Sequence, residues 1–325
     1  MNKKAQTLIV SLWILVILTI LAVSIGHRVS MALRISRYQR DKFKALYLAR
    51  SGLNWTIVEL EKDDPNYDNL NDSWSNNEEK FKKIAFDDKE NDYATVSYET
   101  IDENNEPKTI YGVIDEEKKI NINTMPLALL VKLLEKNEVL NASEIANNIC
   151  AWRGDTNINI PDYKDLGYSN KGSRFINKEE LLLVKDVNQE IYDKLKYLIT
   201  IWGYGKVNIN TTAKEILEIL IDYCIKELEK RNVTDRNPED LIETILQLRG
   251  QDIFFTSFAD LEQKLGDLPN HSGPRNILNV LYPQIDFKSS CFYIISTGKI
   301  NNNRSSDINC IFDRYNKKIL YWHES

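Results

Sequence analysis

The first sixty residues show a pattern of hydrophobic and polar positions that predicts one continuous helix. Residues 8–25 are apolar and uncharged, close to the roughly 20 residues that a helix needs to cross a bilayer. Lys3 and Lys4 precede this run, so the positive-inside rule places the short N-terminus in the cytoplasm and the rest of the chain on the other side. Residues 26–62 contain no proline and continue with apolar side chains at helical spacing, until an acidic pair and Pro65 stop the helix.

Three interpretations of this segment are open. A secretory signal peptide would be cut after the small-x-small triplet Ala22-Val23-Ser24, whereas a simple signal anchor would stay uncut. A prepilin-type leader would be removed on the cytoplasmic side, so that the apolar run stays attached to the mature protein. The amphipathic continuation through residues 26–62 favours the third interpretation, because a signal peptide does not need a helix of that length.

Strand patterns occur near the middle and at the end of the chain. Residues 93–101 and 109–114 alternate between apolar and polar side chains and predict a β-hairpin. The alternation returns after residue 290, in segments 292–297, 308–314 and 318–322. The simplest topology is one antiparallel sheet that packs on the N-terminal helix, with the intervening part of the chain inserted between strands.

The intervening part contains an internal repeat. The segment Lys119-Ile120-Asn121-Ile122-Asn123-Thr124 returns as Lys206-Val207-Asn208-Ile209-Asn210-Thr211. A helix is predicted after each copy, at 127–136 and 214–230, with Asn or Thr caps and a capping box from Thr212 to Glu215. The match continues with Trp152-Arg153-Gly154 and Leu248-Arg249-Gly250, and then with 175–184 and 255–265. The repeat predicts two small helical units in tandem.

Composition narrows the functional classes. The chain has 42 Lys and Arg against 48 Asp and Glu, a net charge of −6, which repels phosphate backbones unless a local basic patch exists. Three His and no Cys-x-x-Cys pair argue against zinc. The sequence has no nucleophile elbow, no His-Glu-x-x-His and no phosphate-binding loop, so no enzymatic activity is expected.

The tandem units also suggest helix-hairpin-helix DNA binding. Lys185-Asp186-Val187-Asn188 stands where such a hairpin would turn. That hairpin needs glycines so that backbone N–H groups can approach a phosphate, and this turn has an acid and no glycine. DNA binding is therefore the less favoured interpretation of the tandem units.

The helix, the strands and the repeat together resemble the minor pseudopilin K family of type II secretion systems (general secretion pathway protein K). The family has a Tyr-x-Ala-Arg-x-Gly-Leu-x-Trp stretch, which this chain carries as Tyr47-Leu48-Ala49-Arg50-Ser51-Gly52-Leu53-Asn54-Trp55. The resemblance implies leader cleavage between Ala5 and Gln6 and methylation of Gln6. Ala5 departs from the usual glycine, whereas Val10 fits the family, which lacks the glutamate that most pilins have at that position.

The expected fold class is α+β: a long N-terminal transmembrane and amphipathic helix on an antiparallel, pilin-like sheet, with an inserted all-α domain of two tandem SAM-like units. The expected divisions are a leader at 1–5, the helix at 6–62, strands at 63–118, the helical domain at 119–283 (repeats 119–205 and 206–283) and strands at 284–325.

An oxygen-rich loop follows Trp152, and it contains Asp155, Asp162 and Asp165. Carboxylates and amide oxygens are ligands that Ca²⁺ favours, and the resembled family binds calcium in loops of its helical domain. A solvated surface loop rich in turn-forming residues explains the same composition. These three aspartates are the candidate calcium ligands.

Two of the four cysteines flank the loop of the C-terminal hairpin. Cys291 and Cys310 are placed symmetrically about the predicted loop, so a disulfide between opposed strands and a pair of buried free thiols are both open. Cys150 and Cys224 fall in predicted helices and are expected in the core.

The resemblance implies a non-enzymatic subunit at the tip of the type II secretion pseudopilus, which helps to initiate assembly and the export of folded proteins across the outer membrane. Its implied partners are the minor pseudopilins I and J, the prepilin peptidase and the inner membrane, with the body in the periplasm and no nucleic acid. The alternative is an anchored or secreted DNA-binding module built from the tandem units.

Overall fold

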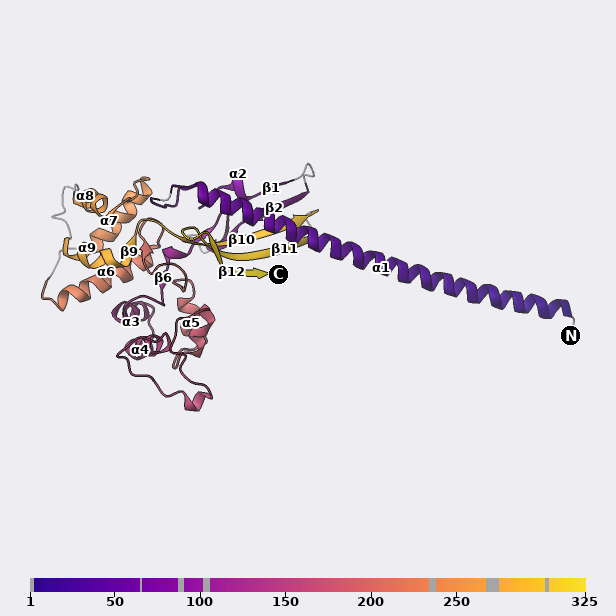
Figure 1. The fold of residues 1–325 in the computed structure, drawn as a ribbon, viewed down its shortest axis with the longest axis horizontal. Coiled ribbons are helices and arrows are strands. Elements are labelled where there is room, and N and C mark those ends of the chain that lie inside the picture. The colour runs from indigo at the N-terminus through magenta and orange to yellow at the C-terminus, as the bar shows by residue number, and fades with distance from the viewer. Residues whose placement is uncertain are drawn as a thin grey trace.

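The computed structural model describes residues 3–64, 66–86, 91–101, 106–233, 238–266, 275–301 and 304–325. Helix α1 (Lys3–Lys62) is 60 residues long, which corresponds to about 90 Å. Its N-terminal half projects away from the rest of the molecule, and its C-terminal part lies along the sheet (Figure 1). The helix ends directly before Asp63, as the acidic pair predicted.

The main sheet is antiparallel and contains strands from both ends of the body. The order is β1-β2-β10-β11-β12, and β5 pairs with the same edge of β10 as β2 does. The strands are β1 (Ile84–Ala85), β2 (Asp92–Val96), β5 (Ile114–Asp115), β10 (Cys291–Ile300), β11 (Arg304–Asp313) and β12 (Lys318–Glu324), and the short helix α2 (Glu78–Phe81) precedes β1. The expected α+β, pilin-like architecture is confirmed.

Small residues bring α1 into close contact with the sheet. A Cβ atom at Gly52 would lie 2.6 Å from the Cβ of Ala94, and a Cβ at Gly298 of β10 would overlap the carbonyl oxygen of Ala45. The Ser296 hydroxyl donates a hydrogen bond of 2.8 Å to the carbonyl of Ala49. The stretch from residue 47 to 55, which carries the family resemblance, therefore supplies part of the contact between helix and sheet, and Ala45 extends it.

The predicted hairpin from residue 93 is wrong in its boundaries. β2 ends at Val96, and β3 (Tyr98–Ile101) leaves the main sheet to pair with β4 (Pro107–Ile110). The reason lies in β10: after its pairing with β2 ends at Ser296, the same edge is occupied by β5 at Phe292 and Tyr293. The chain beyond Val96 therefore pairs with its own return segment.

The inserted domain consists of two helical units, and each is closed by a short pair of parallel strands. In the first unit β6 (Ile120–Asn121) pairs with β7 (Ile199–Thr200), and in the second β8 (Val207–Asn208) pairs with β9 (Ile285–Asp286). The second unit therefore ends at Asp286, slightly beyond the expected limit of 283. One hydrophobic core runs through both units, so they form a single inserted block.

Between these strands the first unit contains α3 (Leu127–Lys136), α4 (Ala142–Trp152), η2 (Lys164–Leu166), η3 (Lys178–Leu183) and α5 (Gln189–Leu195), after the connecting turn η1 (Glu116–Lys118). The second contains α6 (Lys214–Glu229), α7 (Pro238–Gly250), α8 (Phe258–Gly266), α9 (Arg275–Leu281) and η4 (Tyr282–Gln284). Both units lie towards the end of the body that faces away from the projecting half of α1 (Figure 1).

The repeated asparagines occupy equivalent positions in the two units. The Asn123 side chain accepts from the N–H of Phe175 (2.7 Å) and donates to the carbonyl of Phe175 (3.0 Å). Asn210 makes the same pair of bonds to Phe255, at 2.9 and 2.8 Å. Each amide thus holds the segment that starts the second half of its own unit, which explains why the two motifs recur together.

The predicted helix caps are wrong. α3 begins after Pro126 and α6 after Ala213, and neither residue caps its helix through a side chain. The Thr212 hydroxyl donates instead to the carbonyl of Lys118 (2.7 Å). Because the Thr212 hydroxyl is bonded to this connecting turn, it does not form the capping box with its own helix.

Candidate functional site

Helix α1 carries a long series of exposed apolar side chains. The segment that starts at Gln6 has a window of mean hydropathy 2.9 in which no residue is buried, so α1 is long and apolar enough to cross a membrane. Exposed apolar side chains also occur after that window, towards the C-terminal end of α1. Phe43 and Tyr47 are 63% and 65% exposed, and at 100° per residue they lie on the side of α1 opposite to Ala45 and Ala49.

We call this surface the outer stripe, and its members are Val29, Leu33, Phe43, Tyr47 and Val58. A helix that packs on its own sheet along one side needs no apolar residues along the other side. Large exposed apolar patches mark sites of contact with membranes or other proteins. The outer stripe, together with the apolar run, is therefore the candidate functional surface of the anchor helix.

A second feature is a buried junction where the sheet meets both helical units. Asp115, the last residue of β5, accepts hydrogen bonds from the hydroxyls of Thr211 (2.5 Å) and Ser289 (2.7 Å). Both donors belong to the second unit or to the chain that leaves it. Burial raises the pKa of Asp115, since the charged form loses hydration there.

The next two residues continue the junction. Glu116 accepts from the Thr200 hydroxyl (2.6 Å) and pairs with Lys119 (2.5 Å), so it serves the first unit. Burial alone would raise the pKa of Glu116, but Lys119, the Thr200 hydroxyl and Lys178 together outweigh burial, so the pKa is lowered. Glu117 accepts from the backbone N–H groups of Tyr204 (2.9 Å) and Ser290, and burial raises its pKa to about 7. These acids fix the inserted block to the sheet, and the sequence analysis did not single them out.

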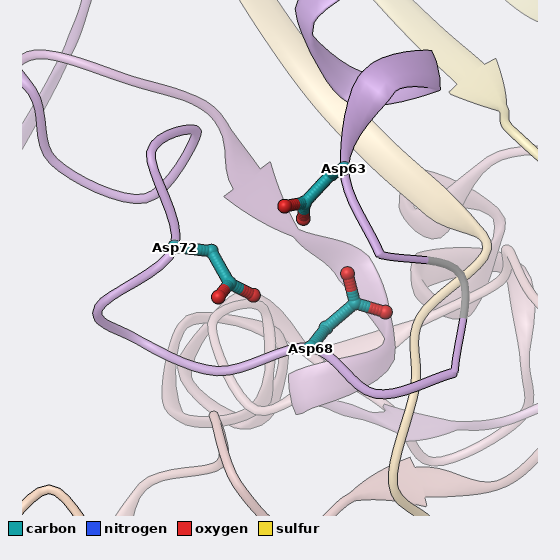
Figure 2. A group of neighbouring side chains, drawn as sticks. All are labelled: Asp63, Asp68 and Asp72. Carbon is teal, nitrogen blue, oxygen red and sulfur yellow. The ribbon is translucent and has the colours of Figure 1, made fainter.

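A group of three carboxylates lies where the chain leaves α1. Each of Asp63, Asp68 and Asp72 offers a ligand oxygen, and these atoms all lie within 4.8 Å of one another. Figure 2 shows the three carboxylates directed at a common space between the end of α1 and the following loop. Arg314 pairs with Asp68 at 2.6 Å and lies 3.7 Å from an oxygen of Asp63.

Burial dominates the electrostatics of this aspartate cluster. It raises the pKa of Asp68 to about 7 and that of Asp72 to about 6, and it also raises that of Asp63. Arg314 acts in the opposite direction on Asp63 and Asp68 but does not cancel the effect. The sequence analysis used Asp63 only as a residue that ends the helix. The acid-rich segment just after a long helix was the one sequence feature that could have indicated this cluster.

The aspartates expected to bind calcium are not brought together. Among the residues that the structure describes, Asp155, Asp162 and Asp165 do not form a group of converging ligand atoms. Both oxygens of Asp155 accept from the guanidinium of Arg153, at 2.8 and 2.5 Å. Asp162 accepts from the N–H of Lys164 and stabilises the turn at η2. Because Arg153 takes the first carboxylate, the three candidate ligands do not converge in this structure, and calcium binding by this loop stays a prediction.

Of the two alternatives left open for Cys291 and Cys310, the structure shows the buried free thiols. Across the C-terminal hairpin Cys291 is opposite Asp313, whereas Cys310 is opposite Ile294. Since 291 and 294 differ by an odd number, the two cysteines lie on opposite faces of the sheet. All four cysteines are buried free thiols, and Cys310 packs in the core between α1 and the sheet.

The predicted leader covers residues 1–5, of which residues 1 and 2 lie outside the described part of the chain. The remaining positions named in the sequence analysis fall in described elements. Ala5 and Gln6 belong to α1. Asp186 takes a left-handed conformation, with φ of 67°, in the turn between η3 and α5, and its carboxylate accepts from the Asn148 amide. An acid at the tip of this turn opposes phosphate binding. The corresponding connection of the second unit, 267–274, lies outside the described residues.

Comparisons with known proteins agree with this architecture. The sequence model of the PilX N-terminal family matches residues 6–54, which covers the apolar run and much of the outer stripe. No curated protein sequence matches. Among solved structures, the GspK chain in the GspK-GspI-GspJ complex from the enterotoxigenic Escherichia coli type 2 secretion system matches with a TM-score of 0.60.

That match spans 89% of this chain and 99% of the solved chain, at 15% sequence identity. The chain shares the fold of GspK. The expected resemblance is thus confirmed over the helix, the sheet and the inserted block together, whereas neither comparison supports the DNA-binding alternative. At this identity, the GspK match establishes the arrangement of elements, and the chemistry of individual sites has to be argued from this chain's own residues.

Proposed function

We propose that this chain is a minor pseudopilin at the tip of a type II secretion pseudopilus, where it helps to initiate assembly and the export of folded proteins across the outer membrane. The observation that carries the proposal is the GspK fold over 89% of the chain, inserted block included. The solved GspK is in complex with GspI and GspJ, and we infer that this chain binds the equivalent minor pseudopilins. Its role is assembly and not catalysis.

The long N-terminal helix fits the processing, membrane anchoring and assembly of a pilin-like subunit. In this proposal the prepilin peptidase removes residues 1–5 and methylates Gln6, and α1 then holds the precursor in the inner membrane with the body in the periplasm. During assembly the apolar part of α1 exchanges lipid for the helices of neighbouring subunits. The outer stripe extends the same contact surface along the part of α1 that lies on the sheet.

Two features support a place at the tip. The inserted block lies beyond the end of the body opposite to the projecting part of α1 (Figure 1), where it would obstruct a subunit stacked above. Position 10 is Val10, so α1 places no carboxylate there for the N-terminal amine of a subunit above. A buried charge without a partner is costly in lipid, and a terminal subunit has no such partner.

The proposal is tested by purifying the full-length chain from membranes together with the minor pseudopilins I and J of the same cell. We expect a stable complex of the three. Tyr47→Lys on the outer stripe should reduce its yield and reduce secretion. Tyr197→Lys is the matched control, because Tyr197 is 75% exposed but lies on the inserted block. A wild-type chain that never associates with I and J would contradict the proposal.

A further inference from the structure

The aspartate cluster at the end of α1 has the properties of a cation site. Its ligand oxygens lie within 4.8 Å of one another, and oxygens that surround one Ca²⁺ at about 2.4 Å are separated by at most about 4.8 Å. We propose that Asp63, Asp68 and Asp72 together bind a divalent cation with oxygen ligands, Ca²⁺ in preference to Mg²⁺. Ca²⁺ is favoured because an irregular loop supplies its flexible coordination more readily than the rigid octahedron of Mg²⁺.

The second observation is an unpartnered, fully buried oxygen within the cluster. Asp68 has 0% of its surface exposed. Its Oδ2 accepts from the N–H of Ser289 (2.7 Å) and from Arg314 (2.6 Å), but its Oδ1 has no hydrogen-bond partner. The Oδ2 of Asp63 is likewise buried without a hydrogen bond. Asp63 Oδ2 still has Arg314 as an ion-pair partner at 3.7 Å. Buried carboxylate oxygens are normally satisfied, so the Oδ1 of Asp68 is the atom left open to a ligand that is not a hydrogen-bond donor of the protein.

The charge balance points to a cation as that ligand. Three carboxylates converge and Arg314 compensates one of them, which leaves two negative charges in a largely buried space. The indole N–H of Trp74, which is buried and makes no hydrogen bond, lies beside Asp63 and Asp72.

A cation here would connect three parts of the molecule. Asp63 directly follows α1, and Asp68 is tied to the exit of the second helical unit through Ser289 and through the carbonyl of Phe287, which accepts from its N–H at 2.9 Å. Arg314 follows β11 and also donates to the Ser289 carbonyl at 2.7 Å. Binding would therefore fix the inserted block relative to the anchor helix. This inference does not depend on the secretion role.

The test uses the full-length chain in detergent and Tb³⁺, which replaces Ca²⁺ and emits when an adjacent tryptophan is excited. Trp74 lies beside the aspartate cluster and Trp152 lies before the Asp155 loop, so the two sites are distinguished by which tryptophan sensitises the ion. We expect Trp-excited emission that Ca²⁺ competes away, that Trp74→Phe abolishes and that Trp152→Phe leaves intact. Emission lost in Trp152→Phe and kept in Trp74→Phe would overturn the assignment.

Thermal unfolding provides the second measurement. Saturating Ca²⁺ should raise the melting temperature of the wild type by about 5 °C, and Mg²⁺ should raise it less. Asp72→Asn should remove this Ca²⁺-induced shift, whereas Asp165→Asn, in the loop that the sequence suggested, should keep it. Asp63→Asn replaces Asp72→Asn if the latter fails to fold. No shift in the wild type, or a full shift in Asp72→Asn, would refute the site, and an equal shift with Mg²⁺ would refute the preference.

Discussion

Replacement of Asn210 by alanine tests how the inserted units are held together. Asn210 is completely buried, and its amide satisfies both the N–H and the carbonyl of Phe255. A third bond, to the carbonyl of Phe287, is long at 3.4 Å, and that carbonyl also accepts from the N–H of Asp68. Alanine therefore leaves two buried backbone groups of Phe255 without partners.

Each such group costs about 1–3 kcal/mol when it is left unpaired, so Asn210→Ala should reduce the free energy of unfolding by about 4 kcal/mol. The matched substitution is Asn123→Ala, which breaks the same two bonds in the first unit. Asn123 is only half-buried, so water can reach Phe175 and we expect a loss of about 1–2 kcal/mol. Asn210→Asp should not rescue, because its second oxygen faces the Phe255 carbonyl.

The assay is denaturant unfolding of the full-length chain in detergent, combined with hydrogen exchange to assign the effect to a unit. Faster exchange in Asn210→Ala should be confined to the second unit around α6 and α8. If Asn123→Ala costs as much as Asn210→Ala, or if Asn210→Ala costs less than about 1 kcal/mol, burial does not control the strength of these bonds and the reasoning is refuted.

Three further predictions concern packing, thiols and pH. Gly298→Ala should displace α1 and cost several kcal/mol in the free energy of unfolding, about 3 or more, whereas Gly250→Ala, where a Cβ meets no atom within 4 Å, should change it little. All four cysteines should resist alkylation in the folded protein and react fully after denaturation without reductant, because burial hides each thiol and raises its pKa well above the usual value. A Cys291–Cys310 bond detected by mass spectrometry would contradict the hairpin register. Burial raises the pKa of Glu117 from 4.5 to about 7, so its contribution to stability is present below pH 4.5 and is lost as pH rises towards 7. Glu117→Gln should reduce the difference in unfolding free energy between pH 5 and 7.5 by up to about 3 kcal/mol, and an unchanged difference would refute this.

The sequence predicted those features whose causes are local or repeated. The apolar run, the continuation of α1 and the start and end of α3 follow from periodicity alone. The repeat was recognisable because Asn123 and Asn210 each bond within their own unit. The same residue type therefore makes the same contact in both units.

The errors arise where a distant segment competes for a local group. Thr212 bonds to the carbonyl of Lys118, 94 residues away, and not to its own helix. The register of the C-terminal hairpin, which separates Cys291 from Cys310, depends on where the turn forms. No local pattern fixes any of these contacts.

The acids at the junction show the same limit. Asp115, Glu116 and Glu117 looked like an ordinary charged turn, because three consecutive acids are normally solvated. They are buried since the two helical units and the sheet supply hydroxyl, lysine and backbone N–H partners from positions up to 174 residues away. The aspartate cluster was missed for a similar reason, because Arg314 and Ser289 reach it from the far end of the chain.

The N-terminal residue of the mature protein, read by intact mass and peptide mapping of material from membranes, tests the pseudopilin account most directly. The account predicts a chain that begins at a methylated Gln6 and keeps the whole apolar part of α1. A chain that begins at Ile25 would show removal of a signal peptide, and an unprocessed Met1 would show a simple anchor. Either of these results would contradict the assignment to the pseudopilus.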